Sequence, residues 1–286
     1  MGEKSKISWT DNSWNPWWGC TNVSPGCDHC YAEGFANRLA LDIWGKDAPR
    51  RFFGDKHWNE PRKWNEKAKK AGVPLKVFCG SMCDICEDRR DLDEQRQRLW
   101  KLIEETPNLI WMLLTKRPQT YLKMLPSWWI DKPLPHVWLM TTVESPDYAW
   151  RVEKLMKVPA VVHGVSWEPA LGYVDFSMYM AERCCSGFEC GCKGLPINPP
   201  PYLDWLIAGG ESGAHCRPFD IAWARRVREG CHQHGVAFFM KQLGGFPDKR
   251  DQPELWPEDL RVQEFPVQHL HSLQSSTRRP DGEPVH

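Results

Sequence analysis

The sequence predicts an α/β fold built as a TIM-like barrel, complete or partial, with an inserted cysteine-rich loop. Two observations carry this prediction. Short apolar, β-branched runs alternate with amphipathic stretches, and a polar motif follows nearly every run. Functional residues of barrels collect at the carboxyl ends of the strands, where these motifs fall. A doubly wound open sheet is the alternative for the same alternation.

Seven apolar runs are candidate strands, and the amphipathic stretches between them are candidate helices. The strands are predicted over residues 6–9, 75–79, 109–115, 137–143, 160–167, 203–208 and 236–240. Helices are predicted over residues 31–41, 92–106, 145–157 and 221–234. Strand and helix therefore succeed each other as parallel βαβ units.

The length of 286 residues suits one large domain over residues 1–246, followed by a polar tail over residues 247–286. The last fifteen residues of the tail are expected to be disordered. Residues 173–201 interrupt the alternation and are interpreted as an inserted loop. Its cysteines have gaps that fit no common zinc pattern, so metal binding there is left open. They are Cys184, Cys185, Cys190 and Cys192.

Charge and targeting signals limit the location and the partners. The 37 basic and 37 acidic residues cancel, so any contact with nucleic acid must be local. Residues 1–14 have no apolar signal-peptide core, and no run approaches a membrane span. We therefore expect a cytoplasmic protein with no membrane partner, in which twelve cysteines serve metal or cluster ligation.

The most informative stretch is a loop in which Cys20, Cys27 and Cys30 have the spacing C-x6-C-x2-C. A Ser-Pro-Gly turn at residues 24–26 lets the loop fold back, which would bring three sulfurs to one point. Three thiolates suit an iron–sulfur cluster or part of a zinc site. A structural zinc ion needs a fourth protein ligand, whereas a cluster held by three cysteines keeps one iron open.

This loop resembles the cluster loop of radical S-adenosylmethionine enzymes, because it ends in Cys30-Tyr31 between a first strand and a first helix. Its first gap is three residues longer than their usual C-x3-C-x2-C spacing. The chain resembles more closely a phage-associated, largely uncharacterised three-cysteine-motif family. The stretches that carry this resemblance are residues 9–11, 14–16, 19–20, 24–33, 114–118, 209–213, 241–242 and 244.

The resemblance implies a radical S-adenosylmethionine enzyme with a [4Fe–4S] cluster on Cys20, Cys27 and Cys30. An external electron donor would reduce the cluster, and cleavage of S-adenosyl-L-methionine would give a 5′-deoxyadenosyl radical that takes a hydrogen atom from the substrate. The cofactor-binding residues it implies are Tyr31, Gly80, Ser81, Met82, Glu144 and Glu168. For the two glutamates, an ordinary acid at a helix N-terminus is an equal alternative.

A second triplet, Cys79, Cys83 and Cys86, has the more usual C-x3-C-x2-C spacing. Either it is the cofactor-binding site itself, or it holds an auxiliary cluster beside the first. We favour the auxiliary cluster, because the Cys-Tyr ending belongs to the first loop. The prediction is thus two clusters in the chain, the second completed by a remote cysteine such as Cys216, by substrate or by a small ligand.

Positive charge after the strands suggests a substrate class. Lys116, Arg117 and Arg217 follow predicted strands, and arginine pairs well with phosphate. With the phage setting of the resembling family, this favours a nucleic acid or nucleotide substrate, and a protein or peptide target stays open. Glu211 and Lys241 complete the predicted substrate-binding set. The competing functions are a metal-dependent barrel hydrolase and a non-enzymatic iron–sulfur or zinc protein that binds nucleic acid.

Overall fold

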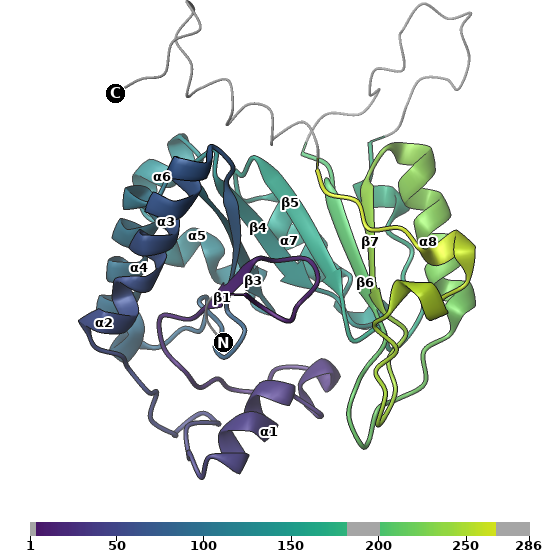
Figure 1. Ribbon diagram of the computed structural model, residues 1–286, viewed down its shortest axis with the longest axis horizontal. Helices are drawn as coiled ribbons and strands as arrows, with labels where there is room; N and C mark the ends of the chain where they lie inside the picture. The colour runs from purple at the N-terminus through teal and green to yellow at the C-terminus, as the bar shows by residue number, and fades with distance from the viewer. Residues whose placement is uncertain (1–3, 182–200, 267–286) are drawn as a thin grey trace, which may run out of the picture. The chain divides into compact units, whose positions relative to one another are not determined.

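The computed structural model describes residues 4–181 and 201–266 (Figure 1). Contacts divide the chain into two compact units. The first comprises the described residues of Met1–Thr141 together with Val158–Val162, and the second comprises those of Thr142–Lys157 and His163–Pro266. Each unit is an α/β structure with parallel strands, so the predicted fold class is confirmed at this level. The single domain over residues 1–246 stays a prediction.

The strands of the first unit pair in chain order, and every pairing is parallel. They are β1 (Asn12–Trp14), β2 (Leu75–Cys79), β3 (Leu109–Thr115) and β4 (Val137–Thr142). Nearly every residue of β3 and β4 is buried. Parallel strands covered on both faces have continuous apolar sequences, which is why these runs are readable in the sequence.

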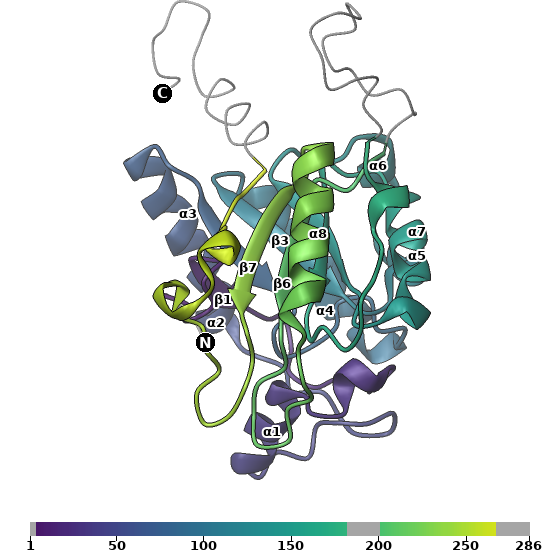
Figure 2. The ribbon, with the colours of Figure 1, turned by 90° about the vertical axis from the view of Figure 1, so that its right-hand side faces the viewer.

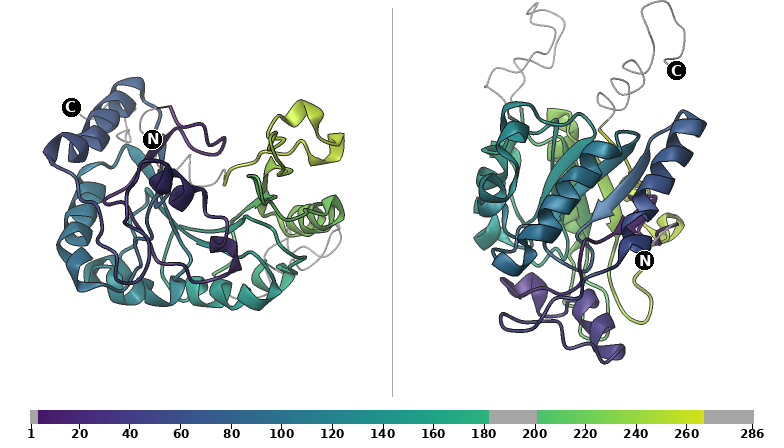
Figure 3. Two further views of the ribbon diagram at one scale, coloured as in Figure 1. Left: turned by 90° about the horizontal axis from the view of Figure 1, so that it is seen from below. Right: turned by 90° about the vertical axis from the view of Figure 1, so that its left-hand side faces the viewer.

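The helices of the first unit flank its sheet, except that α1 lies beyond the carboxyl ends of the strands (Figures 1 and 3). They are α1 (Tyr31–Arg38), α2 (Asp55–Trp58), α3 (Glu60–Ala71), α4 (Asp93–Glu105), α5 (Tyr121–Met124) and α6 (Ser127–Asp131). Helix α3 packs against β2, β3 and α4. The Trp14 ring contacts those of Trp58 and Trp111, with centroids 4.9 and 5.8 Å apart. Large aromatic surfaces thus fix the first strand against the sheet and its helices.

The first strand lies later in the chain than the predicted residues 6–9. A turn occupies this region, because Ser5 N donates to Asp11 O at 2.8 Å and Thr10 N donates to Ile7 O at 3.2 Å. The Trp9 ring is buried and contacts Phe78, with centroids 4.6 Å apart. Only Trp9 of this segment is buried, while Lys6 and Ser8 are exposed, so a turn places one large ring in the core and the strand prediction there is wrong.

The second unit contains β5 (Val162–Trp167), β6 (Trp205–Gly209), β7 (Ala237–Gln242), α7 (Trp150–Met156) and α8 (Ile221–His234). β6 pairs in parallel with β5 and β7, and α8 lies beside β6 and β7 (Figure 2). Asp220 caps the start of α8, because its Oδ1 accepts a hydrogen bond from Ala222 N at 2.8 Å. Gly235 ends the helix in the left-handed backbone conformation, at φ 71°. These two signals are local, so the predicted bounds of α8 are confirmed.

Several predictions concern segments that the structure does not describe or describes only in part. The four cysteines of the inserted loop and the last fifteen residues lie outside the described residues.

Strands at residues 75–79 and 109–115 are confirmed with their bounds. Within the described ranges, no helix combines the length and the apolar character needed to cross a membrane.

Two glycines of the second unit allow a matched stability prediction. A Cβ on Gly210 would lie 2.3 Å from Leu243 O, whereas a Cβ on Gly230, inside α8, meets nothing within 4 Å. We expect Gly210→Ala to destabilise the fold by about 1–3 kcal/mol through overpacking. Gly230→Ala should stabilise it by about 0.5–1 kcal/mol, because alanine favours the helix. Chemical denaturation of both variants measures this, and equal effects would contradict the close approach at Gly210.

Candidate functional site

The loops that follow β1, β2 and β3 meet at the carboxyl edge of the sheet in the first unit. Gly19 N donates to Met82 O at 2.9 Å, which ties the first loop to the second. The Tyr31 hydroxyl donates to Ser81 O, also at 2.9 Å. The structure therefore brings together the first cysteine loop and the Gly80–Met82 segment, two of the predicted cofactor-binding regions.

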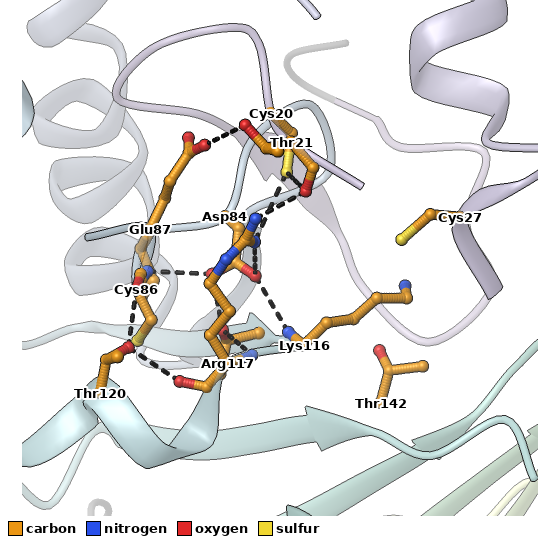
Figure 4. A network of polar contacts seen from close by, with 12 residues as sticks. Cys20, Thr21, Cys27, Asp84, Cys86, Glu87, Lys116, Arg117, Thr120 and Thr142 are labelled. Carbon is orange, nitrogen blue, oxygen red and sulfur yellow. Dashed lines mark hydrogen bonds and ion pairs between the residues drawn. The ribbon is translucent and has the colours of Figure 1, made fainter. Parts of the chain in front are cut away.

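Asp84 is the centre of a buried polar network in these loops (Figure 4). Its carboxylate accepts from Thr115 Oγ1 at 2.5 Å, from Cys86 N and Lys116 N at 3.0 Å, and from Arg117 Nη1 at 2.8 Å. Burial alone would raise the pKa of Asp84, but Arg117 and these hydrogen bonds lower it below 3.8. The ionised carboxylate of Asp84 therefore stabilises the fold at neutral pH. This contribution is lost as the pH falls from the ordinary carboxyl range through the lowered pKa of Asp84.

Arg117 joins this network to the first cysteine loop. Its Nη1 lies 3.7 Å from Cys20 Sγ, and its Nη2 donates to Thr21 O at 2.6 Å. The residue is only 8% exposed. Burial would lower its pKa, yet Asp84 and Cys20 raise it, so the guanidinium keeps its charge. The sequence predicts Arg117 as a substrate contact, whereas these groups engage it inside the protein.

Thr21 is held from a second side by a buried ion pair. Arg50 Nη2 lies 2.7 Å from Glu87 Oε1, and the two side chains are 0% and 5% exposed. The Thr21 hydroxyl donates to the same oxygen at 2.7 Å and accepts from Arg50 at 2.9 Å. The start of the cysteine loop is therefore fixed by two charged pairs, one on each side of Thr21.

All cysteines that the structure describes are free thiols. Burial raises the pKa of the Cys20 thiol to about 12, with Asp84 adding to the rise and Arg117 opposing it. Burial also raises the pKa of Cys30, while backbone hydrogen bonds and the Lys116 charge oppose the rise. In the absence of a metal, both groups are therefore neutral thiols at physiological pH. A bound metal favours thiolates over protons, because the thiolate is the ligand.

The donor chemistry of the first loop fits an iron–sulfur cluster. Three free thiols lie within eleven residues, and a guanidinium beside Cys20 can balance the negative charge of a thiolate-held cluster. Cys27 lies apart from the Arg117 network, with its sulfur 3.9 Å from the Ser24 hydroxyl (Figure 4). Over the described ranges, no three His, Cys, Asp or Glu side chains are grouped closely enough to hold a metal ion. Closing the site on a cluster thus requires the loop to gather its sulfurs.

The second triplet does not fit a cluster in the described conformation. Cys79 and Cys86 are 0% exposed and Cys83 is 7% exposed. Cys79 is the last residue of β2 and pairs with Trp14 and Leu113 on the neighbouring strands. A cluster there would have to displace this packing. The auxiliary cluster stays a prediction for iron analysis to decide.

The candidate residues of the second unit form ion pairs with one another or with nearby basic side chains. Glu144, 0% exposed, pairs with Arg151 Nη1 at 2.7 Å inside the unit, and no sequence signal points to this partner. Two predicted residues, Glu168 directly after β5 and Lys241 within β7, form an ion pair. Glu211 accepts from Arg217 Nη2 at 2.6 Å, so these two predicted residues also meet.

Sequence reasoning missed the residues that organise the first cysteine loop. These are Asn15, Thr21, Arg50, Asp84 and Glu87. Asn15 Oδ1 accepts from Met82 N at 2.7 Å, and its Nδ2 donates to Ser81 Oγ at 2.8 Å. Asn15 directly follows β1, and Asp84 lies in the loop after β2. Functional residues of parallel sheets collect at this end of the strands, so their position is a signal that the sequence offers. Arg50 and Glu87 carry no comparable local signal.

Comparisons with known proteins place the chain in one family. Neither the comparison with curated proteins nor that with solved structures gave a match. A family model described as "Protein of unknown function (DUF5131)" matches residues 4–282, almost the whole chain. The chain therefore belongs to the DUF5131 family.

Proposed function

We propose that this chain is a radical S-adenosylmethionine enzyme that acts on a nucleic acid or nucleotide. One observation supports it most. A loop of three free cysteines follows β1 at the carboxyl edge of a parallel sheet, and hydrogen bonds join it to the loops after β2 and β3. The carboxyl edge is where cofactors bind in parallel α/β proteins. The resemblance to the phage-associated three-cysteine-motif family is part of this proposal.

In the proposed site Cys20, Cys27 and Cys30 hold a [4Fe–4S] cluster and leave one iron open. When bound, the cluster and S-adenosyl-L-methionine would supply an electron and a cleavable carbon–sulfur bond, and thereby a radical that takes hydrogen from the substrate. The electron would come from an external donor protein or reductant. An auxiliary cluster on Cys79, Cys83 and Cys86 is the second part of the proposal, and the burial of that triplet weighs against it.

The chain's own residues position and charge-balance this site. Tyr31 anchors the end of the cysteine loop to Ser81, and Arg117 with Thr21 anchors its start. The half-buried Lys116 adds positive charge near Cys30. Because Arg117 is engaged internally, Lys116 is the better candidate for a phosphate contact at this edge.

The proposal also covers the barrel architecture and the cellular location of the protein. The strands pair in chain order within each unit, which is the order that a TIM-like barrel requires. We propose a partial barrel of this type and a cytoplasmic location, where thiols stay reduced.

Anaerobic reconstitution with iron and sulfide tests the proposal. We expect a brown protein with broad absorbance near ~400 nm that forms 5′-deoxyadenosine from S-adenosyl-L-methionine when reduced. One [4Fe–4S] cluster gives about four irons per chain, and two give about eight. A colourless chain that binds zinc and forms no 5′-deoxyadenosine would support the non-enzymatic zinc protein or the barrel hydrolase instead.

A further inference from the structure

The contact between Arg117 and Cys20 has a consequence for any metal centre built on this loop. Among the three cysteines, Cys20 lies 3.7 Å from a guanidinium nitrogen. That nitrogen also lies 2.8 Å from Asp84 Oδ2, so the cation and its counter-ion lie together beside one sulfur. Both side chains are at most 10% exposed, and charges in such surroundings are poorly screened by water.

This ion pair is rigidly held, so its charges have fixed positions. Asp84 accepts hydrogen bonds from Thr115 and from two backbone amides as well as from Arg117. The Arg117 backbone is also fixed, because its N–H donates to Thr115 Oγ1 at 2.8 Å. A preorganised dipole of this kind acts on a neighbouring charge without reorganising.

We propose that Arg117 is a positioning residue that donates a charge-assisted hydrogen bond to the Cys20 sulfur and raises the reduction potential of a cluster ligated there, with Asp84 as the opposing charge. The inference rests on the proposed function, because it requires Cys20 to be a cluster ligand. Hydrogen bonds to ligand sulfurs and nearby charge are established determinants of cluster potential. Reduction by one electron adds negative charge, which a cation stabilises and an anion destabilises.

The two partners should therefore shift the potential in opposite directions. Arg117→Gln removes the cation and should shift the equilibrium between oxidised and reduced cluster about tenfold toward the oxidised form. Asp84→Asn removes the anion and should shift it about tenfold toward the reduced form. A tenfold shift corresponds to about 59 mV for a one-electron couple. The double variant should return close to the parent, and Arg117→Lys, which keeps the charge, should stay closer to the parent than Arg117→Gln.

The measurement is a redox titration of the reconstituted full-length chain, followed by electron paramagnetic resonance with dithionite as reductant. Arg62→Gln is the matched control, because Arg62 is 41% exposed on α3 and pairs with Glu105 in the same unit. Its potential should equal that of the parent. Opposite shifts for the two partners support the inference, since a purely structural loss would not change sign between them.

The outcomes separate this inference from the proposed function. If the parent holds a cluster and both single variants have its potential, Arg117 has no tuning role, although the cluster proposal stands. If Arg117→Gln fails to fold, Asp84→Asn still decides, and an unchanged potential there overturns the inference. If the parent takes up no iron, the proposed function is wrong and this inference is wrong with it.

Discussion

Replacing Cys20, Cys27 and Cys30 together by alanine is expected to abolish reductive cleavage of S-adenosyl-L-methionine. The three thiols are the only protein ligands in the proposed cofactor-binding cluster, and without them no cluster can present an open iron. The loop itself should keep its anchors, because Thr21 and Tyr31 bind through groups that the substitutions leave in place. The measurement is 5′-deoxyadenosine formed by the reduced, reconstituted protein under anaerobic conditions, together with iron per chain.

The matched control for this variant is Cys231→Ala. Cys231 is a buried free cysteine of α8 in the second unit, and its thiol has no role in the proposed chemistry. This control should retain both iron and cleavage. Product formed at the parental level by the triple variant would refute the assignment. If cleavage instead disappears when Cys79, Cys83 and Cys86 are replaced, the cofactor-binding cluster lies on the second triplet.

Replacing Arg151 by methionine is expected to cost about 3–5 kcal/mol of unfolding free energy, the largest stability effect that we predict. Arg151 and Glu144 are 1% and 0% exposed along their side chains, so the substitution leaves a carboxylate buried without its cation. Arg151 also packs over the Tyr148 ring at 4.4 Å and donates to Thr142 O at 3.0 Å, and both contacts are lost. Chemical denaturation followed by circular dichroism measures the change.

Two comparisons isolate the cost of the unpaired charge. Arg225→Met removes an arginine of the same unit whose ion pair with Asp259 is exposed, and it should leave the unfolding midpoint almost unchanged. The double variant Arg151→Met with Glu144→Gln should recover much of the loss, because it removes both buried charges. Similar losses for Arg151→Met and Arg225→Met would show that Glu144 is not held by a buried charge.

The sequence by itself determined the local and periodic features of this protein. The strand at residues 109–115 is readable because a strand buried on both faces is a continuous apolar run, and the strand at residues 75–79 because its second half, Val77–Cys79, is apolar and buried. Helix α8 is readable because Asp220 and Gly235 mark its ends. The strand predicted over residues 6–9 was wrong, because a turn can alternate polar and apolar residues as a strand does, and here it buries only Trp9. The three-cysteine spacing likewise identifies donors, whatever the fold does with them.

Only the tertiary structure decided which charges meet. Arg117 and Cys20 are 97 positions apart, and they lie together because parallel pairing of β1, β2 and β3 brings the ends of these strands to one edge. An arginine after a strand has the same local sequence signal whether it binds a substrate phosphate or a buried aspartate. Its partner, and hence its role, depends on strand register and burial, which arise from contacts between distant residues.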